Sequence, residues 1–219
     1  RNARKAAYQL ATNAGTDDEG QFEMLRKLEL SEADHVELMS YCQSTGIKFL
    51  SSAFDPEGID YLCSLGLDTI KVPSGELINL PYLRKAGQSG KQVWLSCGMG
   101  TLGEIDAAVN VLINQGLDRE KLILLHCNTE YPTSFEDANL KVVTTLQSTF
   151  NLEVGYSDHT MGIEAPIAAV VLGAVLVEKH FTLNREMKGP DHKASLEPEE
   201  LKSMVASIRN VEAALGDGY

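Results

Sequence analysis

The stretch LILLHCNTEYPT, residues 122–133, has the pattern of a strand buried on both faces that ends in polar residues. Apolar residues open it, and His126 and Asn128 stand where the apolar run ends. Short, nearly continuous apolar runs of this kind are typical of parallel strands covered by helices. The same order of apolar run, polar end, turn and amphipathic helix recurs along the chain. The expected strands are residues 47–52, 69–72, 93–96, 122–127, 153–157 and 175–181.

Helix signals lie between these strands. Ser31 and Thr101 are typical N-cap residues, Pro198 suits the first turn of a helix, and glycines follow the expected C-termini. The expected helices are residues 31–46, 55–66, 101–116, 162–172 and 198–216. Strands and helices that alternate with roughly 30 residues per βα pair predict an α/β fold, a parallel (β/α)8 TIM-type barrel.

The number of expected strands is smaller than the eight of a closed barrel of this type. The chain also begins with a helix-like segment rather than a strand. We therefore expect residues 1–219 to form one barrel domain that lacks the first two βα units. An open, doubly wound sheet of six strands is the alternative, although no glycine-rich dinucleotide fingerprint supports it.

Composition restricts the classes of partner. A formal net charge of -12 argues against nucleic acid, because phosphate backbones need a basic surface. No apolar run reaches the roughly 18 residues that cross a bilayer, and the N-terminus lacks the apolar core of a signal peptide. The four cysteines form no CxxC pair and are expected to be free thiols. We therefore expect a cytoplasmic protein that does not bind membranes.

Two histidines follow consecutive expected strands, at the edge where the chemistry of a parallel barrel gathers. His159 follows the strand at 153–157, and His180 stands near the end of the strand at 175–181. Two neutral imidazoles that converge at a solvent-accessible edge can bind a divalent ion and leave positions open for water or substrate. This favours an octahedral Lewis-acid ion over a closed structural zinc. The alternative is a pair of hydrogen-bonded core histidines.

Lys71 lies near the end of the strand at 69–72, within KVPSGE, where burial without a partner would be costly. An anionic ligand would satisfy the ammonium group, and Ser74 with Gly75 would add hydroxyl and backbone donors. An internal ion pair with Glu76 or Glu178 is the alternative. A Schiff-base lysine is a third possibility.

Side chains alternate along a strand, so Ser157 and His159 share one face while Asp158 takes the other. Neighbouring strand residues cannot line up as a relay, which excludes a Ser-His-Asp hydrolase triad here. If His180 faces the barrel interior, Glu178 does too, and Lys179 points outward. Asp191, in the polar loop after the last strand, is a candidate base or hydroxyl binder, or else a solvated loop acid.

Six strings across nearly the whole chain resemble the N-acetylneuraminate synthase family, in its bacterial form and close to the legionaminate synthase branch. They are KVPSGE from Lys71, LSCGMG from Leu95, LHCNTEYPT from Leu125, GYSDHTMG from Gly155, EKHFTL from Glu178 and GPDHKASLEP from Gly189. The stretch DEGQFEMLRKLELS is also similar. The resemblance implies condensation of phosphoenolpyruvate with an N-acetylated hexosamine, such as N-acetylmannosamine or a 2,4-diacetamido sugar. The products are a nine-carbon 2-keto sugar acid and phosphate.

The resemblance also implies roles for single residues. His159 and His180 match metal ligands, with Mn²⁺ expected and Mg²⁺ or Co²⁺ as alternatives. Four residues match groups that hold phosphoenolpyruvate: Lys71, Ser74, Ser96 and Ser157. Tyr131 and Asp191 match contacts near the sugar and the intermediate, and Glu76 matches a nearby polar position. Either Asn128 or Thr129 matches a ligand contact.

The resemblance is incomplete at both ends. The family's first two strands, with an active-site glutamate and lysine, and its small C-terminal antifreeze-like domain have no counterpart in residues 1–219. That domain reaches the partner's site in a homodimer, which we expect for the full-length protein. A 3-deoxy-octulosonate phosphate synthase is a near rival, although it would need a second basic cluster for a phosphorylated sugar. A non-catalytic sugar- or anion-binding barrel is the rival from another class.

Overall fold

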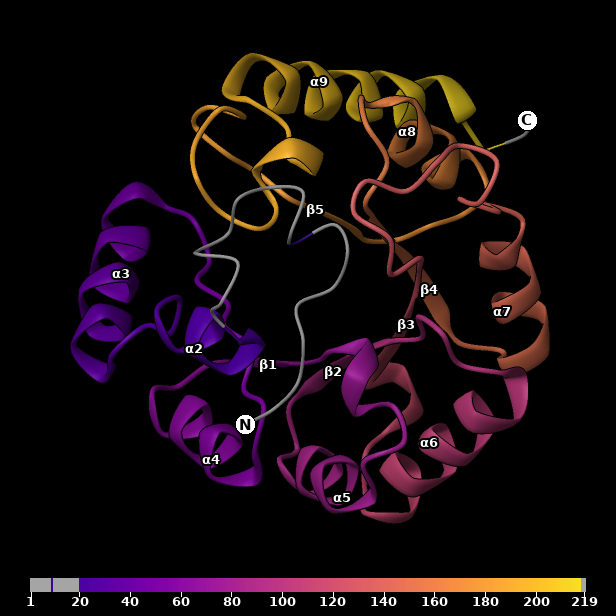
Figure 1. Ribbon diagram of the computed structural model, residues 1–219. Helices are drawn as coiled ribbons and strands as arrows, with labels where there is room; N and C mark the ends of the chain where they lie inside the picture. Colours follow the sequence, from indigo (N-terminus) through magenta and orange to yellow (C-terminus); the bar gives the residue numbers. More distant parts are fainter. Residues whose placement is uncertain (1–8, 10–19, 218–219) are drawn as a thin grey trace.

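One parallel sheet organises the molecule (Figure 1). The computed structural model describes residue 9 and residues 20–217. The strands are β1 (Thr69–Val72), β2 (Gln92–Ser96), β3 (Leu122–Cys127), β4 (Glu153–Asp158) and β5 (Val177–Lys179). They lie in the order β1-β2-β3-β4-β5, and every neighbouring pair is parallel. A doubly wound sheet reverses its order at a switch point, so this sequential order excludes that alternative and confirms the predicted TIM-type α/β architecture.

Helices lie around the outside of the sheet (Figure 1). They are α2 (Gln21–Arg26), α3 (Glu32–Thr45), α4 (Pro56–Ser64), α5 (Leu80–Gln88), α6 (Leu102–Asn114), α7 (Val142–Phe150), α8 (Glu164–Val171) and α9 (Pro198–Leu215). Short 3₁₀ turns occupy Ser74–Glu76, Arg119–Lys121 and His192–Ala194. Ser31 and Thr101 cap their helices as predicted, each in a reciprocal capping box. The sequence prediction omitted α5 and α7.

The expected strand at 47–52 is wrong. These residues have no regular structure, and Ile47 is 66% exposed. A strand needs a hydrogen-bonded neighbour, and the described part of the chain places no strand on the free side of β1. The last strand is also shorter than the expected 175–181. The backbone of Val175 still donates to Val154, and that of His180 accepts from Leu196, outside the regular ladder.

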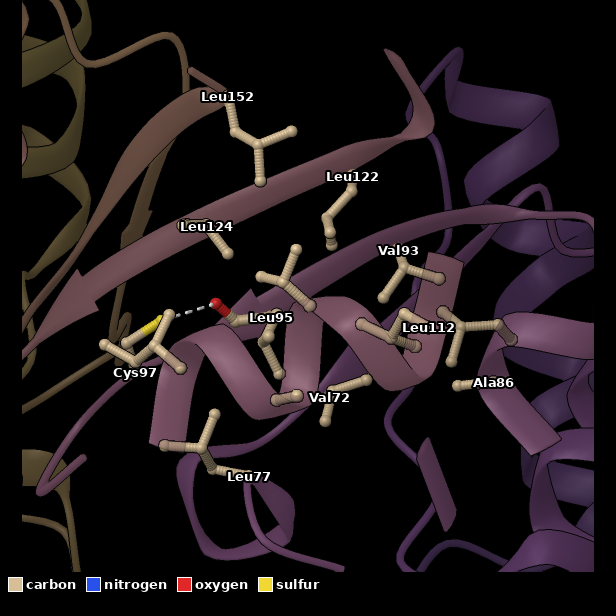
Figure 2. Close-up of a cluster of buried hydrophobic side chains, with 14 of the residues drawn as sticks. Val72, Leu77, Ala86, Val93, Leu95, Cys97, Leu112, Leu122, Leu124 and Leu152 are labelled. Carbon is tan, nitrogen blue, oxygen red and sulfur yellow. Dashed lines mark hydrogen bonds between the residues drawn. The ribbon is translucent and has the colours of Figure 1, made fainter. Parts of the chain in front are cut away.

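The main core fills the space between the outer face of the sheet and α4 to α8. Val72, Val93, Leu95 and Leu124 point from three strands toward the helices, where Leu112 of α6 meets them (Figure 2). Burying each such aliphatic side chain contributes about 1.5–3 kcal/mol. Because side chains alternate, the residues between these core positions face the barrel interior. Lys71 is one of them, as the sequence predicts.

The chemical state of the cysteines agrees with the sequence expectation. All four cysteines are free thiols. Across residue 9 and residues 20–217, no helix combines the length and apolar character needed to span a bilayer.

Candidate active site at the carboxyl ends of the strands

Lys71, Ser157 and Glu178 form one group on the interior face of the sheet, here called the interior cluster. Ser157 and Glu178 are register partners in β4 and β5. The Ser157 hydroxyl donates to Glu178 Oε1 over 2.6 Å, and Lys71 Nζ lies 3.2 Å from the same oxygen. The Lys71 side chain is 9% exposed and that of Glu178 is 37% exposed. Lys71 therefore has the ion pair with Glu178 that the sequence left open as an alternative.

His159 and His180 lie together, as their positions on consecutive strand ends predicted. Their ring centroids are 5.2 Å apart, with an angle of 58° between the ring planes. The Tyr131 ring lies 4.0 Å from that of His159 and meets the His180 ring edge-on at 5.5 Å. The two histidines, here called the imidazole pair, therefore share one site with Tyr131 beside it.

The surroundings of His159 keep its imidazole neutral. Burial is the main cause that lowers the pKa of His159 to about 4. Its Nδ1 lies 2.5 Å from the carbonyl oxygen of Asn128, an acceptor that requires the proton on Nδ1. Nε2 then keeps a lone pair. A backbone carbonyl that fixes the tautomer in this way is typical of a metal-binding histidine.

Asp191 completes this edge of the site. One oxygen, Oδ2, lies 3.9 Å from His180 Nδ1, and the other, Oδ1, is buried without a hydrogen-bond partner in residue 9 and residues 20–217. The Ser195 hydroxyl holds the loop by donating to the Asp191 carbonyl over 2.8 Å. A buried carboxylate oxygen without a partner is costly, and a cation or a hydroxyl group would satisfy it.

The donor set fits a divalent ion held by few protein ligands. Within residue 9 and residues 20–217, no group of three or more His, Cys, Asp or Glu side chains has the arrangement of a complete metal centre. The imidazole pair offers two nitrogens, and the orphaned Asp191 oxygen lies in the same region. Most coordination positions would remain for water or substrate, which suits an octahedral ion rather than a structural zinc.

Ser74, Gly98 and Thr129 approach one another beside the interior cluster. The Ser74 hydroxyl accepts from the backbone N–H of Gly98 over 3.1 Å and lies 3.2 Å from Cys127 Sγ. A Cβ atom at Gly98 would lie 2.7 Å from Ser74 Oγ and 2.8 Å from Thr129 Cγ2. Only glycine permits this close approach. Ser96 is 2% exposed, and its hydroxyl has no partner in the part of the chain that the structure describes, so it can donate to a ligand.

Glu76 and Asn128 use their side chains within their own loops. Glu76 Oε2 accepts from the Asn79 amide over 2.5 Å. Asn128 Oδ1 accepts from the Glu130 N–H over 2.8 Å, and its amide nitrogen donates to the Asp137 carbonyl. Asn128 therefore contributes its backbone carbonyl to the site, whereas its neighbour Thr129 presents a side chain beside Ser74.

The predicted set of site residues omitted Glu178, although its carboxylate joins Lys71 to Ser157. The available signal was strand alternation, because Glu178 lies two residues before His180 and therefore on the same face. Fold and geometry together define a parallel TIM-type barrel with three features at its strand ends: a buried lysine paired with a glutamate, buried hydroxyl and carboxylate oxygens without partners among the described residues, and an imidazole pair.

Comparison with known proteins gives the family. The NeuB family model matches residues 1–219. The chain is 52% identical, over 99% of its length, to the N,N'-diacetyllegionaminic acid synthase of Campylobacter jejuni, and 45% identical, over 100% of its length, to that of Legionella pneumophila. It spans 64% and 61% of the length of these two relatives. The chain therefore belongs to the NeuB family.

A solved structure agrees with this assignment. The N-acetylneuraminic acid synthetase of Leptospira borgpetersenii, in complex with citrate, superimposes with a TM-score of 0.86 at 33% identity. The match covers 92% of this chain and 70% of that one.

Proposed function

We propose that the protein condenses phosphoenolpyruvate with an N-acetylated sugar to give a nine-carbon 2-keto sugar acid and phosphate. The observation that supports this most directly is the placement of the interior cluster beside the imidazole pair. The interior cluster can hold an anion, and the imidazole pair can hold the cation that polarises an aldehyde. The two N,N'-diacetyllegionaminic acid synthases among the relatives favour a 2,4-diacetamido sugar over N-acetylmannosamine as the acceptor.

The chemistry balances as a carbon–carbon bond formation followed by loss of phosphate. The vinyl carbon of phosphoenolpyruvate attacks the open-chain sugar aldehyde, whose oxygen takes up a proton. Water adds to the resulting oxocarbenium carbon and loses a proton, and phosphate then leaves to give the keto acid. A divalent ion bound by His159 and His180, Mn²⁺ in our proposal with Mg²⁺ or Co²⁺ as alternatives, would supply Lewis-acid polarisation of the aldehyde.

Lys71, Ser74, Ser96 and Ser157 would bind phosphoenolpyruvate. Lys71 lies 3.2 Å from Glu178 and can exchange that partner for a phosphate or carboxylate, because Glu178 is open to water. The Ser96 hydroxyl has no competing partner within the described chain and would donate to the same anion. The Ser74 hydroxyl, which accepts from the Gly98 N–H, would add a further donor at the adjoining loop.

Tyr131 and Asp191 would contact the sugar. The Tyr131 ring lies against both imidazoles, which supports a contact with the aldehyde end of the acceptor. The buried oxygen of Asp191 would accept a hydrogen bond from a sugar hydroxyl, or take up the proton that the attacking water loses. Glu76 and Thr129 would contribute to the walls of this region.

The test is a phosphate-release assay on the natural gene product with phosphoenolpyruvate and Mn²⁺. Three acceptors are compared: the 2,4-diacetamido sugar, N-acetylmannosamine and its 6-phosphate. We expect release only with acceptor present, fastest with the diacetamido sugar, and a keto acid whose mass equals that of the sugar plus pyruvic acid. Preference for a phosphorylated sugar would move the protein to another synthase class. Absence of release with all three, together with no heat on adding Mn²⁺ or phosphoenolpyruvate, would favour a non-catalytic binding barrel.

The assembly and the cellular location stay predictions. A homodimer would sediment at twice the mass of the chain. A cytoplasmic enzyme would appear in the soluble fraction of its own cells.

A further inference from the structure

A second charged group lies on the opposite face of the same two strands. Asp158 and Lys179 are register partners in β4 and β5, one residue beyond Ser157 and Glu178. Their side chains are 0% and 2% exposed, and Lys179 Nζ contacts Asp158 Oδ2 directly. Because alternate strand residues face opposite sides, this pair lies between the sheet and the helices. Tyr156, which shares that face, belongs to the main core.

Every polar atom of the pair has a partner. Asp158 Oδ1 accepts from the Tyr156 hydroxyl over 3.0 Å and from the Thr160 N–H over 2.9 Å. Lys179 Nζ also donates to the Thr160 carbonyl over 2.5 Å. We call Tyr156, Asp158, Thr160 and Lys179 the rear cluster. Thr160 takes part through its backbone, whereas its buried hydroxyl finds no partner within the described residues. A buried ion pair whose own polar atoms are all bonded is rigid, because any displacement leaves a charge without a partner.

The rear cluster encloses the backbone of His159 and adjoins that of His180. Asp158 and Thr160, the residues on either side of His159, are both bonded within the cluster. Lys179 directly precedes His180. The cross-strand ion pair therefore joins the two backbone positions from which the imidazole rings project toward the site.

The stability of the fold alone does not require an ion pair at this buried position. Removing two charges from water costs several kcal/mol per ion, and apolar residues of similar volume often replace a buried pair without loss. A hydrogen-bonded ion pair between β4 and β5 fixes the distance and direction between the two strands at this point, which an apolar contact does not.

We infer that Asp158 and Lys179 are positioning residues that set the spacing and orientation of the imidazole pair, and so its affinity for the metal ion. This inference rests on the proposed metal-dependent function. It assigns no contact with substrate to either residue. The interior cluster, on the other face of the strands, holds phosphoenolpyruvate independently of it.

The test is a double variant, Asp158→Asn with Lys179→Met, in the natural gene product. It removes both charges together, so no buried ion is left unpaired, and the oxygen of the introduced amide can still accept from Tyr156 and Thr160. We expect Mn²⁺ affinity to fall by about 10-fold or more, the size seen when supports of metal-ligating histidines are removed. Phosphoenolpyruvate affinity without metal should stay within about 2-fold, because the interior cluster is untouched.

A matched control removes a charge pair elsewhere. Arg209→Gln with Glu212→Gln deletes an ion pair on the exposed side of α9, where the side chains are 70% and 46% exposed. This control should bind Mn²⁺ and phosphoenolpyruvate as the wild type does. The electron paramagnetic resonance spectrum of bound Mn²⁺ should change in the double variant and not in the control.

The outcomes separate the two proposals. If the wild type itself binds no Mn²⁺, the proposed function fails and this inference fails with it. If the wild type binds Mn²⁺ and the double variant gives the same affinity and spectrum, the positioning role is wrong while the proposed function stands. Equal losses of Mn²⁺ and phosphoenolpyruvate affinity would show a merely structural role.

If the double variant does not fold, a milder variant can still test the positioning role. Tyr156→Phe keeps both charges and removes only the hydroxyl that donates to Asp158. We expect a change in the Mn²⁺ spectrum and an affinity loss of a few-fold, with unaltered phosphoenolpyruvate binding. An unchanged spectrum in this variant would overturn the inference.

Discussion

Strand β5 takes part in two lysine–carboxylate pairs, one on each of its faces. Glu178 pairs with Lys71 of β1 on the interior face, and Lys179 pairs with Asp158 of β4 on the rear face, and the two pairs differ in exposure and in number of partners. On the interior face, Glu178 is 37% exposed and joins Lys71 to Ser157. On the rear face, Asp158 is 0% exposed and accepts from three donors. The interior pair can therefore open to admit an anion, whereas the rear pair can open only by leaving a buried charge unpaired.

This difference separates binding from positioning along the same pair of strands. Changes on the interior face should mainly reduce ligand binding or turnover. Changes on the rear face should reduce Mn²⁺ affinity, and those that leave one buried charge unpaired should also lower the free energy of unfolding by more than a matched change on the interior face.

The largest effect is expected at the imidazole pair. His180→Ala should abolish metal-dependent turnover, a loss of at least about 10³-fold, because one of two metal nitrogens is lost. The His180 side chain is 33% exposed, so the circular dichroism spectrum and melting temperature should change little. Turnover measured with phosphoenolpyruvate and acceptor at saturating Mn²⁺ checks this. Unchanged activity would remove the Lewis-acid role from His180.

The next largest effect is expected in stability, on the rear face. Asp158→Ala should lower the free energy of unfolding by about 3–5 kcal/mol, because it leaves the Lys179 ammonium buried and uncompensated. Glu178→Gln, the matched change on the interior face, should cost less, about 1–2 kcal/mol, because the Lys71 ammonium that it leaves unpaired lies beside a position that water reaches. Urea unfolding of both variants measures the contrast. Equal losses would show that the two faces do not differ as argued.

A smaller effect is expected in the affinity for phosphoenolpyruvate when Lys71 is replaced. Lys71→Met should weaken binding of phosphoenolpyruvate by about 10–100-fold, because one charge-assisted contact is lost. Binding of Mn²⁺ to the same variant should be retained, since the imidazole pair does not contact Lys71. Calorimetric titration with each ligand separates the two. Retained affinity for phosphoenolpyruvate would assign Lys71 to the ion pair with Glu178 alone.

The smallest effect is expected in the pH dependence of stability, at His126. Its ring stacks on that of Tyr156, a member of the rear cluster. Burial lowers the pKa of His126, and its Nε2 lies 2.8 Å from the Ala138 carbonyl. As the pH falls below about 6.5, the unfolded chain takes up this proton first, so the free energy of unfolding decreases toward the lower folded-state pKa. His126→Gln should make that decrease shallower. If the wild type and His126→Gln show the same pH dependence of the free energy of unfolding in urea, this role of His126 is wrong.

The sequence predicts those features that depend on strand periodicity. Alternation places Lys71 and Glu178 on one face and Lys179 on the other, and consecutive strand ends bring His159 and His180 together. The structure confirms these placements. Periodicity cannot show which partner a side chain finds. It therefore left the ion pair of Lys71 open and did not indicate that Asp158 pairs with Lys179.

Features that depend on distant neighbours escape such prediction. Residues 47–52 have the composition of a strand, but the described chain offers them no neighbouring strand. Asn128 has the side chain of a ligand-binding residue, yet it supports His159 through its backbone carbonyl. Local sequence gives the residue types in both cases, and tertiary contacts decide what they do.

Nitrogen couplings to bound Mn²⁺ test the central claim most directly, that His159 and His180 share one cation. Pulsed electron paramagnetic resonance of the natural gene product with one equivalent of Mn²⁺ should show two imidazole nitrogens. His159→Ala and His180→Ala should each show one nitrogen and weaker binding. A wild-type spectrum without nitrogen couplings, or one that neither variant changes, would contradict the account.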